Sequence, residues 1–338
     1  MHVGLSNAQI LTSRLCDDWE KRVVNWVNDQ EIFLYDNLGG FDDSMKNMLL
    51  DKIPPNLKVR TEYLLPDNIK KSYPTLDIRF DAELMIRGNH FRKFVRKAVP
   101  KNQTMENFVC SFFRTFYQGR VWLLCWLHEL GWFAPDYGSK NFIIEKYPDE
   151  IKQLYFENIG NDFDHISKHA AREQMQQLIV CKNSNSCRSN HKDNLPSISD
   201  AIQKSFVCIV AETHPAHFYP FPTEKFLYPI VNGTLWVAYA QPGYHKFITE
   251  KLGFKLYDCF DYSFDSITDH IQRLAAMTDM LMKFSTMSLS DWQKVYDTQS
   301  KIIDYNSQHA NSGQFITVLR QFDEVNAVKN SFPVDIAK

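Results

Sequence analysis

The chain has 338 residues, of which 44% are hydrophobic and 23% are charged. This length suits two domains of ordinary size, and the apolar content is too high for an intrinsically disordered chain. The formal net charge is −2, which argues against recognition of nucleic acid through overall positive charge, although a local basic face is compatible with it.

Membrane and export signals are not evident in the sequence. The N-terminal segment carries charged residues early and has no long apolar core of the signal-peptide type. No stretch approaches about 18 uncharged apolar residues, the length expected of a membrane-spanning helix. The seven cysteines are odd in number and scattered through apolar runs, which indicates reduced thiols. We therefore expect a cytoplasmic protein without a membrane partner.

The first hundred residues contain one predicted helix and two predicted strands. Tryptophan and valine recur at helical spacing over 17–27, which predicts a helix there. An apolar run over 32–35 predicts a strand, and the Asp-Asn-Leu-Gly-Gly segment at 36–40 is typical of a turn beside a cleft. A second strand is predicted over 76–85.

The next predicted elements are a strand over 108–113, the Gly119-Arg120 loop and a helix with the sequence VWLLCWLHELGW. The polar stretch around 182–200 predicts a surface loop. Near the C-terminus, Ser288 or Ser290 is expected to cap a helix that runs through Trp292.

The strongest pattern in the chain lies between residues 205 and 258. Strand, helix, strand, helix and strand are predicted over 206–210, 223–233, 235–240, the segment between Gly243 and Gly253, and 254–257. This alternation is typical of a parallel α/β unit. Ligands of such sheets bind outside the carboxyl ends of the strands, often against helix N-termini. Glu212 and Thr223-Glu224-Lys225 are expected at that edge, which predicts a site for an anionic, sugar-bearing ligand.

The same residues carry a resemblance to a known family. Glu212, an irregular loop, Thr223-Glu224-Lys225, a hydrophobic helix and a strand followed by Pro-Gly-Tyr resemble the donor-binding half of fucosyltransferase-like, GT-B-type glycosyltransferases. The strand over 108–113 and the Gly119-Arg120 loop resemble the segment that opens this domain. Together the matches cover roughly a third of the chain. The loop THPAHFYPFP departs from the polar segment of that family.

The resemblance implies an α/β fold with two Rossmann-like lobes of the GT-B type and a C-terminal helical segment. Residues 1–100 would form the acceptor-side lobe, 101–285 the nucleotide-sugar-binding lobe, and 286–338 a helical tail that crosses back to the N-terminal lobe. It also implies transfer of a sugar from a nucleotide-sugar co-substrate to a hydroxyl group of a glycan or another soluble acceptor, with no cofactor and no metal.

A nucleotide sugar brings a diphosphate, so its site needs cationic or N–H donors. Lys225 is the first candidate because it lies in the first turn of a predicted helix, where the helix dipole favours phosphate. Arg120 could reach a phosphate with both arms of its guanidinium, and Arg114 competes for that role. Arg273 is a weaker candidate. Each could instead be an ordinary surface or ion-paired residue.

Acidic and aromatic residues complete the predicted site. Glu212 and Glu224 could accept hydrogen bonds from ribose or sugar hydroxyls, beside Thr223, and Tyr219 could stack on a ring. An inverting transferase also needs a carboxylate base, which the resemblance places in the N-terminal half. Asp36 is our choice because it ends a predicted strand. The alternatives left open are Asp42, Asp43, Asp77 and Asp81.

Other functions remain open at this level. The composition, rich in Asn, Phe and Lys, is common in phage and large-virus proteins, so the enzyme could be a phage-type DNA glycosyltransferase that acts on hydroxymethylated bases in the host cytoplasm. Double-stranded DNA would then contact a basic groove. The candidate residues for that groove are Arg87, Arg92, Lys93, Arg96, Lys97 and Lys101. A non-catalytic nucleotide- or carbohydrate-binding protein is a second alternative, and a dehydrogenase is disfavoured because no GxGxxG follows a predicted strand.

Overall fold

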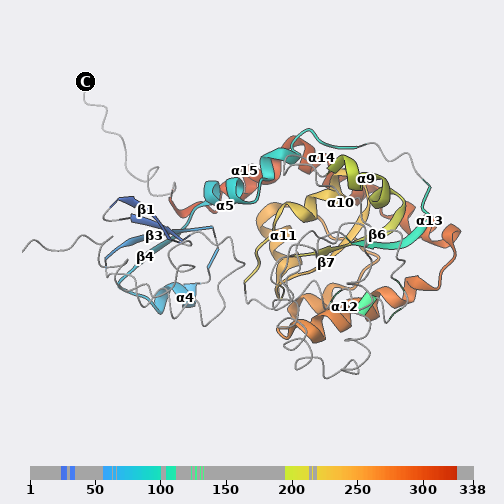
Figure 1. Cartoon of the computed structure of the whole chain (residues 1–338), viewed down its shortest axis with the longest axis horizontal. Coiled ribbons are helices and arrows are strands. Elements are labelled where there is room, and N and C mark those ends of the chain that lie inside the picture. The colour runs from blue at the N-terminus through green and yellow to red at the C-terminus, as the bar shows by residue number, and fades with distance from the viewer. Residues whose placement is uncertain are drawn as a thin grey trace, which may run out of the picture.

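In the computed structural model, the described part of the chain forms a mixed α/β structure with two separate small sheets (Figure 1). The described residues are 24–28, 31–34, 56–62, 64, 65, 67–99, 104–111, 123, 126, 127, 130, 132, 195–212, 215 and 219–325. Among them, no helix combines the length and the apolar character needed to cross a bilayer.

The N-terminal sheet has the strand order β1-β2-β3-β4. Its strands are β1 (Val24–Asn28), β2 (Glu31–Leu34), β3 (Lys58–Thr61) and β4 (Asp77–Phe80). β1 is antiparallel to β2, whereas β2, β3 and β4 are parallel to one another. Burial alternates along β3 and β4, and Val59 and Phe80 are fully buried. One face of this sheet therefore packs on the core.

One short helix lies between β3 and β4, and two more follow β4. They are α4 (Asp67–Lys71), α5 (Ala82–Gly88) and the 3-10 helix η1 (Phe91–Phe94). Asp81 starts α5 because its carboxylate accepts a hydrogen bond from the backbone N–H of Leu84 at 3.0 Å. Phe91 of η1 is buried and meets Phe226, from the second half of the chain, edge to face at 5.9 Å between centroids.

The second sheet has the order β5-β6-β7, and all three strands are parallel. Its strands are β5 (Asn107–Ser111), β6 (Ser205–Ala211) and β7 (Leu235–Tyr239). β6 and β7 are buried at every position, as expected for a parallel sheet that is covered on both faces.

Helices cover both faces of this second sheet. α9 and α10 lie on one side of the strands and α12 lies on the other (Figure 1). The helices of this half are α9 (Leu195–Gln203), η4 (Glu224–Phe226), α10 (Leu227–Val231), α11 (Tyr244–Leu252), η5 (Tyr262–Ser266), α12 (His270–Ser285) and α13 (Leu289–Thr298).

An aromatic cluster fills the face under α12 and α13. Phe108 of β5 and Phe206 of β6 are stacked with ring centroids 6.3 Å apart. Trp292 of α13 lies 5.3 Å from Phe108 and 5.8 Å from Phe206, and Phe284 of α12 lies 5.7 Å from Phe206. Such aromatic packing contributes both buried area and preferred ring geometry, and it fixes α12 and α13 on the sheet.

The last helices, α14 (Ser300–Ser312) and α15 (Gln314–Arg320), lead back to the N-terminal sheet. α15 contacts α5. The carboxylate of Glu324 accepts hydrogen bonds from the backbone N–H of Phe80 at 2.8 Å and from Lys70 Nζ at 2.6 Å. Arg320 Nε lies 2.5 Å from Glu83. These contacts bind the C-terminal helices to the N-terminal sheet.

The carboxyl ends of the two sheets lie on facing sides. β4 runs directly into α5, and β7 runs through a short turn into α11. Figure 1 shows α5 and α11 on the sides where the two sheets approach each other. Because β2, β3 and β4 are parallel, as are β5, β6 and β7, each set of parallel strands points toward the other sheet.

Several predicted elements are confirmed with small shifts. β2, β6 and β7 match the runs over 32–35, 206–210 and 235–240, and α11 ends at Gly253 as expected. Ser288 caps α13, accepting a hydrogen bond from Asp291 N at 3.3 Å. β5 begins one residue before the predicted strand over 108–113, whose last two residues lie outside the described part.

Two N-terminal predictions are wrong. The helix predicted over 17–27 gives way to β1 at 24–28, because pairing with β2 overrides a short helical spacing; residues 17–23 lie outside the described part. The strand predicted over 76–85 ends at Phe80, since the side chain of Asp81 starts a helix there.

Two later predictions are also wrong. The apolar run over 254–257 is not a strand: the side-chain amide of Asn306 donates to Lys255 O and accepts from Lys255 N, both at 2.8 Å, and replaces a strand partner. The loop predicted up to residue 200 instead becomes helix α9 from Leu195 onward. Ile198 and Ile202 of α9 are buried, which explains a helix in an otherwise polar stretch.

Candidate functional site

The candidate site lies at the carboxyl edge of β6 and β7. Glu212 directly follows β6, and its backbone N–H donates to Tyr239 O at 3.1 Å, which continues the ladder between the two strands. The side chain of Glu212 is 0% exposed. A carboxylate in such a place needs compensating donors, because an unpaired buried charge is strongly unfavourable.

Glu212 receives hydrogen bonds from three residues. Its Oε1 accepts from Thr223 N at 2.9 Å and from the Tyr244 hydroxyl at 2.7 Å. Its Oε2 accepts from Thr223 Oγ1 at 2.8 Å and from Lys225 Nζ at 3.4 Å. Lys225 Nζ also donates to Thr223 Oγ1 at 2.8 Å. We call Glu212, Thr223, Lys225 and Tyr244 the Glu212 cluster.

The Glu212 cluster joins three elements. Thr223 caps η4, Lys225 belongs to η4, and Tyr244 opens α11. Burial, together with the negative charge of Glu212, raises the pKa of Tyr244 well above its usual value, so the hydroxyl stays protonated as a donor. Lys225 retains some contact with solvent, since its side chain is 18% exposed.

Glu212 occupies the position at the start of η4 where an anion would be expected to bind. The Thr223 N–H and the Lys225 ammonium, two donors that would attract a phosphate there, both point to the Glu212 carboxylate. The half-buried side chains at this edge include Tyr219, Glu224 and Lys225. A ligand would therefore meet those side chains, with Glu212 behind them.

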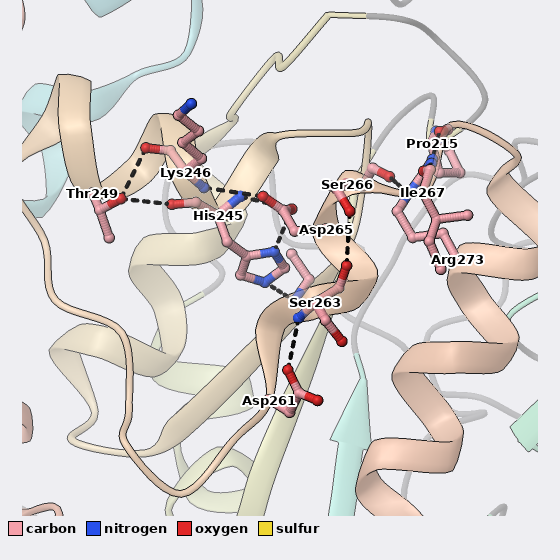
Figure 2. Close-up of polar contacts among 12 residues, drawn as sticks. Pro215, His245, Lys246, Thr249, Asp261, Ser263, Asp265, Ser266, Ile267 and Arg273 are labelled. Carbon is pink, nitrogen blue, oxygen red and sulfur yellow. Dashed lines mark hydrogen bonds and ion pairs between the residues drawn. The ribbon is translucent and has the colours of Figure 1, made fainter.

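A second buried carboxylate, Asp265, holds the start of α11 (Figure 2). Its Oδ1 accepts from His245 Nδ1 at 2.8 Å and from His245 N at 3.0 Å, and its Oδ2 accepts from Lys246 N at 3.1 Å. Burial by itself would raise the pKa of Asp265, but the hydrogen bonds from the side chain and backbone of His245 and from the Lys246 N–H hold it below its usual value. Asp265 therefore acts as an ionised helix cap.

The His245–Asp265 pair is structural in this arrangement. Because Nδ1 faces Asp265, the ring donates from Nδ1 and accepts at Nε2, where the backbone N–H of Ala238 lies 3.0 Å away. The His245 side chain is 1% exposed, and both ring nitrogens are bound inside the protein. A general base needs a nitrogen that can reach a substrate, and His245 has none. Its role is to accept a hydrogen bond from the backbone of β7.

Arg273, a weaker candidate for phosphate binding, is buried. Its guanidinium donates to Ala240 O at 2.9 Å and Thr268 O at 3.0 Å, and also to the carbonyls of Ile267 and Pro215 (Figure 2). Only 2% of the residue is exposed. Arg273 thus ties α12 to the loops at the carboxyl edge, and its charge is spread over backbone carbonyls.

Carboxylates also line the end of the N-terminal sheet. Asp81 follows β4, caps α5 and lies 3.7 Å from Arg60. Asp77 is at the opposite end, because it begins β4, and it forms an ion pair with Arg79 at 2.7 Å. Glu62 directly follows β3 and is 2% exposed. Glu62 and Asp81 therefore mark the carboxyl edge of this sheet.

The described structure contains part of the predicted site. It brings Glu212, Thr223 and Lys225 together, with Glu224 in the same turn. Asp36, Arg114 and Arg120 lie outside the described residues, as do Asp42 and Asp43. Sequence reasoning missed Tyr244, Asp265 and Glu62. The Pro-Gly-Tyr segment pointed to Tyr244, whereas Asp265 and Glu62 had no local signal.

Comparisons with known proteins give no relatives. No protein-family model matches the chain, and no curated protein or solved structure is significantly similar to it. Within the described ranges, no group of three or more His, Cys, Asp or Glu side chains is arranged to hold a metal ion. The function therefore has to be argued from the residues at the carboxyl edges.

The Glu212 cluster predicts a measurable loss of stability in Glu212→Gln. The amide keeps one acceptor oxygen, but its NH₂ group faces hydroxyl and N–H donors, so at least one buried donor loses its partner. We expect the free energy of unfolding to fall by about 1–3 kcal/mol in denaturant titrations. Glu250→Gln is the matched control, because Glu250 is 54% exposed and pairs only with Lys246 among the salt bridges of α11; it should change little. Equal losses in both variants would contradict the prediction.

His270 predicts a pH dependence of stability. Burial, assisted by the charge of Arg273, lowers the pKa of His270 from 6.5 to about 4 in the folded chain, and His270 Nδ1 lies 2.9 Å from the Tyr239 hydroxyl. Between these two pKa values the unfolded chain binds more protons than the folded chain. The contribution of His270 to the free energy of unfolding is therefore fully present above pH 6.5 and falls as the pH drops toward 4. Chemical denaturation between pH 4 and 6.5 gives the free energy of unfolding at each pH. We expect this free energy to change less steeply with pH in His270→Gln than in the unaltered chain. An equal dependence on pH in both proteins would contradict the assignment to His270.

Proposed function

We propose that this chain is a nucleotide-sugar-dependent glycosyltransferase of the GT-B type. Three features support the proposal: two sheets whose parallel strands direct their carboxyl ends toward each other, a Thr-Glu-Lys turn at one of those ends, and the resemblance of this segment to fucosyltransferase-like enzymes. Ligands of open α/β sheets bind at such carboxyl edges.

The observation that carries the proposal is the position of Lys225. Its ammonium is held at the carboxyl edge of β6 by Thr223 Oγ1 and Glu212 Oε2, and part of the side chain reaches the surface. A lysine oriented by a buried carboxylate can present a fixed positive charge to a diphosphate at little entropic cost. Glu212 would then act behind the ligand and orient Lys225.

The remaining roles follow from the chemistry. The acceptor hydroxyl attacks the anomeric carbon of the sugar, the bond to the diphosphate breaks, and the hydroxyl proton passes to a carboxylate. Lys225, with Arg120 or Arg114, would stabilise the departing diphosphate. Glu224 would accept from ribose or sugar hydroxyls, Tyr219 would stack on a ring, and Asp36 would be the base.

A nucleotide-sugar screen tests the proposal. We expect one of the GDP-, UDP-, ADP- and CMP-linked sugars to raise the thermal midpoint, because a ligand present at about 100 times its Kd stabilises the folded state by about 2.7 kcal/mol. Lys225→Ala should remove most of this stabilisation. Lys246→Ala is the matched control, since Lys246 is 71% exposed on α11 and should leave the shift unchanged.

Two outcomes would count against the transferase. If none of the four donors changes the midpoint, the donor site is not as proposed. If a donor binds but its sugar is neither transferred to glycan or DNA acceptors nor lost to water, the chain is a non-catalytic nucleotide-binding protein.

A DNA acceptor is the second candidate, favoured by a run of basic side chains near α5 and η1. The exposed members of this basic run are Arg87, Arg92, Lys93, Arg96 and Lys97. Lys101 lies outside the described residues. Acidic side chains offset part of the charge, because Glu83 contacts Arg92 at 2.7 Å and Arg320 at 2.5 Å. Duplex DNA would contact the basic run through its phosphates.

Salt dependence tests the DNA candidate. Each phosphate contact contributes about −0.9 to the slope of log K against log salt concentration. We expect Lys93→Gln combined with Arg96→Gln to make this slope shallower by up to about 1.8 for duplex DNA. Lys294→Gln serves as the control, because Lys294 lies on α13 and its side chain is 75% exposed. An equal slope in the double variant and in the unaltered chain would exclude the basic run as a DNA contact.

A further inference from the structure

Two cysteines occupy directly paired positions in the second sheet. Cys110 of β5 and Cys208 of β6 are register partners in parallel strands. Both are free thiols, and Cys208 is 3% exposed while Cys110 is half-buried. Side chains of register partners extend to the same face of a sheet, so the two thiols lie beside each other.

The neighbouring pair on the same strands supports this arrangement. Phe108 and Phe206 precede the cysteines by two residues, and therefore lie on the same face. Their rings stack at 6.3 Å, with an interplanar angle of 16°. β5 and β6 thus hold the side chains of this neighbouring residue pair close together and nearly parallel, under α12 and α13.

The spacing and the contact between the thiols are suitable for a covalent bond. Neighbouring strands lie about 4.8 Å apart, which is inside the range of about 4.4–6.8 Å that disulfides span between Cα atoms. A hydrogen bond with the Cys110 thiol, followed by burial, raises the pKa of Cys208 well above its usual value. The hydrogen bond between the two thiols places the Cys208 sulfur next to that of Cys110, where it can act as the resolving partner.

We propose that Cys110 and Cys208 form an oxidisable dithiol, a modification site at which an oxidant of the peroxide class joins β5 to β6 through a disulfide bond. This inference is independent of the proposed transferase. β6 ends at the Glu212 cluster, so the bond would form in the strand that carries the candidate site.

The reaction balances with a single peroxide. The sulfur of the half-buried Cys110 attacks a peroxide oxygen first, the O–O bond breaks, and the hydroxide that leaves takes up the Cys110 proton as water. The Cys208 sulfur then attacks the resulting sulfenic acid, the S–O bond breaks, and the hydroxyl group leaves as water with the Cys208 proton. Two thiols lose two electrons, and the peroxide is reduced to two waters.

Peptide mapping of the full chain tests the proposal. Reduced protein is treated with hydrogen peroxide, the remaining thiols are alkylated, and the protein is digested with trypsin without reduction. Tryptic peptides 102–114 and 205–225 each contain one cysteine, Cys110 and Cys208 respectively. We expect one species with the summed mass of these peptides less two hydrogens, which disappears on addition of dithiothreitol.

Variants separate this bond from other oxidation. Cys110→Ser should abolish the linked species, whereas Cys259→Ser should leave it unchanged, because Cys259 lies between α11 and η5 and is not a register partner of Cys110 or Cys208. Sulfinic or sulfonic acid at Cys110 without a linked peptide would overturn the proposal. So would a bond between Cys208 and Cys259, or oxidation confined to cysteines outside this sheet. The map of the unaltered chain decides between these outcomes even if Cys110→Ser folds poorly.

Discussion

The buried carboxylate of Glu212 is the interaction on which the carboxyl edge of the second sheet depends. A fully desolvated charge is tolerated only when donors surround it, and here the donors come from three residues on two further elements. The requirement to satisfy Glu212 therefore fixes where Thr223 starts η4, where Lys225 points, and how Tyr244 begins α11.

The other buried charged side chains of this edge are also surrounded by hydrogen-bond partners. Asp265 accepts hydrogen bonds from the first turn of α11, and Arg273 donates hydrogen bonds to four backbone carbonyls. Charged groups bound in this way rigidify a site because each one loses several hydrogen bonds when it moves. The result is a fixed platform, at whose surface Lys225, Glu224 and Tyr219 are partly exposed. Preorganised charge of this kind is what the proposed diphosphate site would require.

The two sheets are linked by contacts distant in sequence. α15 packs on α5, and Glu324 is bonded to Lys70 and to the backbone of Phe80. Phe91 and Phe226 add an apolar contact. The polar part of this linkage is partly exposed and the apolar part is buried, so we expect the aromatic contacts to contribute more to holding the sheets together. Both carboxyl edges therefore keep a defined relation to the C-terminal helices.

The sequence by itself determined the elements with strong local signals. Continuous apolar runs gave β6 and β7, the glycine at position 253 ended α11, and Ser288 capped α13. It also placed Glu212 and Thr223-Glu224-Lys225 at one edge of a parallel sheet. Only the tertiary structure decided that Glu212 is buried against Lys225, that Asp265 caps α11, and that Phe254–Tyr257 is a loop completed by Asn306. These outcomes depend on partners distant in the chain, and local periodicity carries no information about which distant donor will satisfy a buried group.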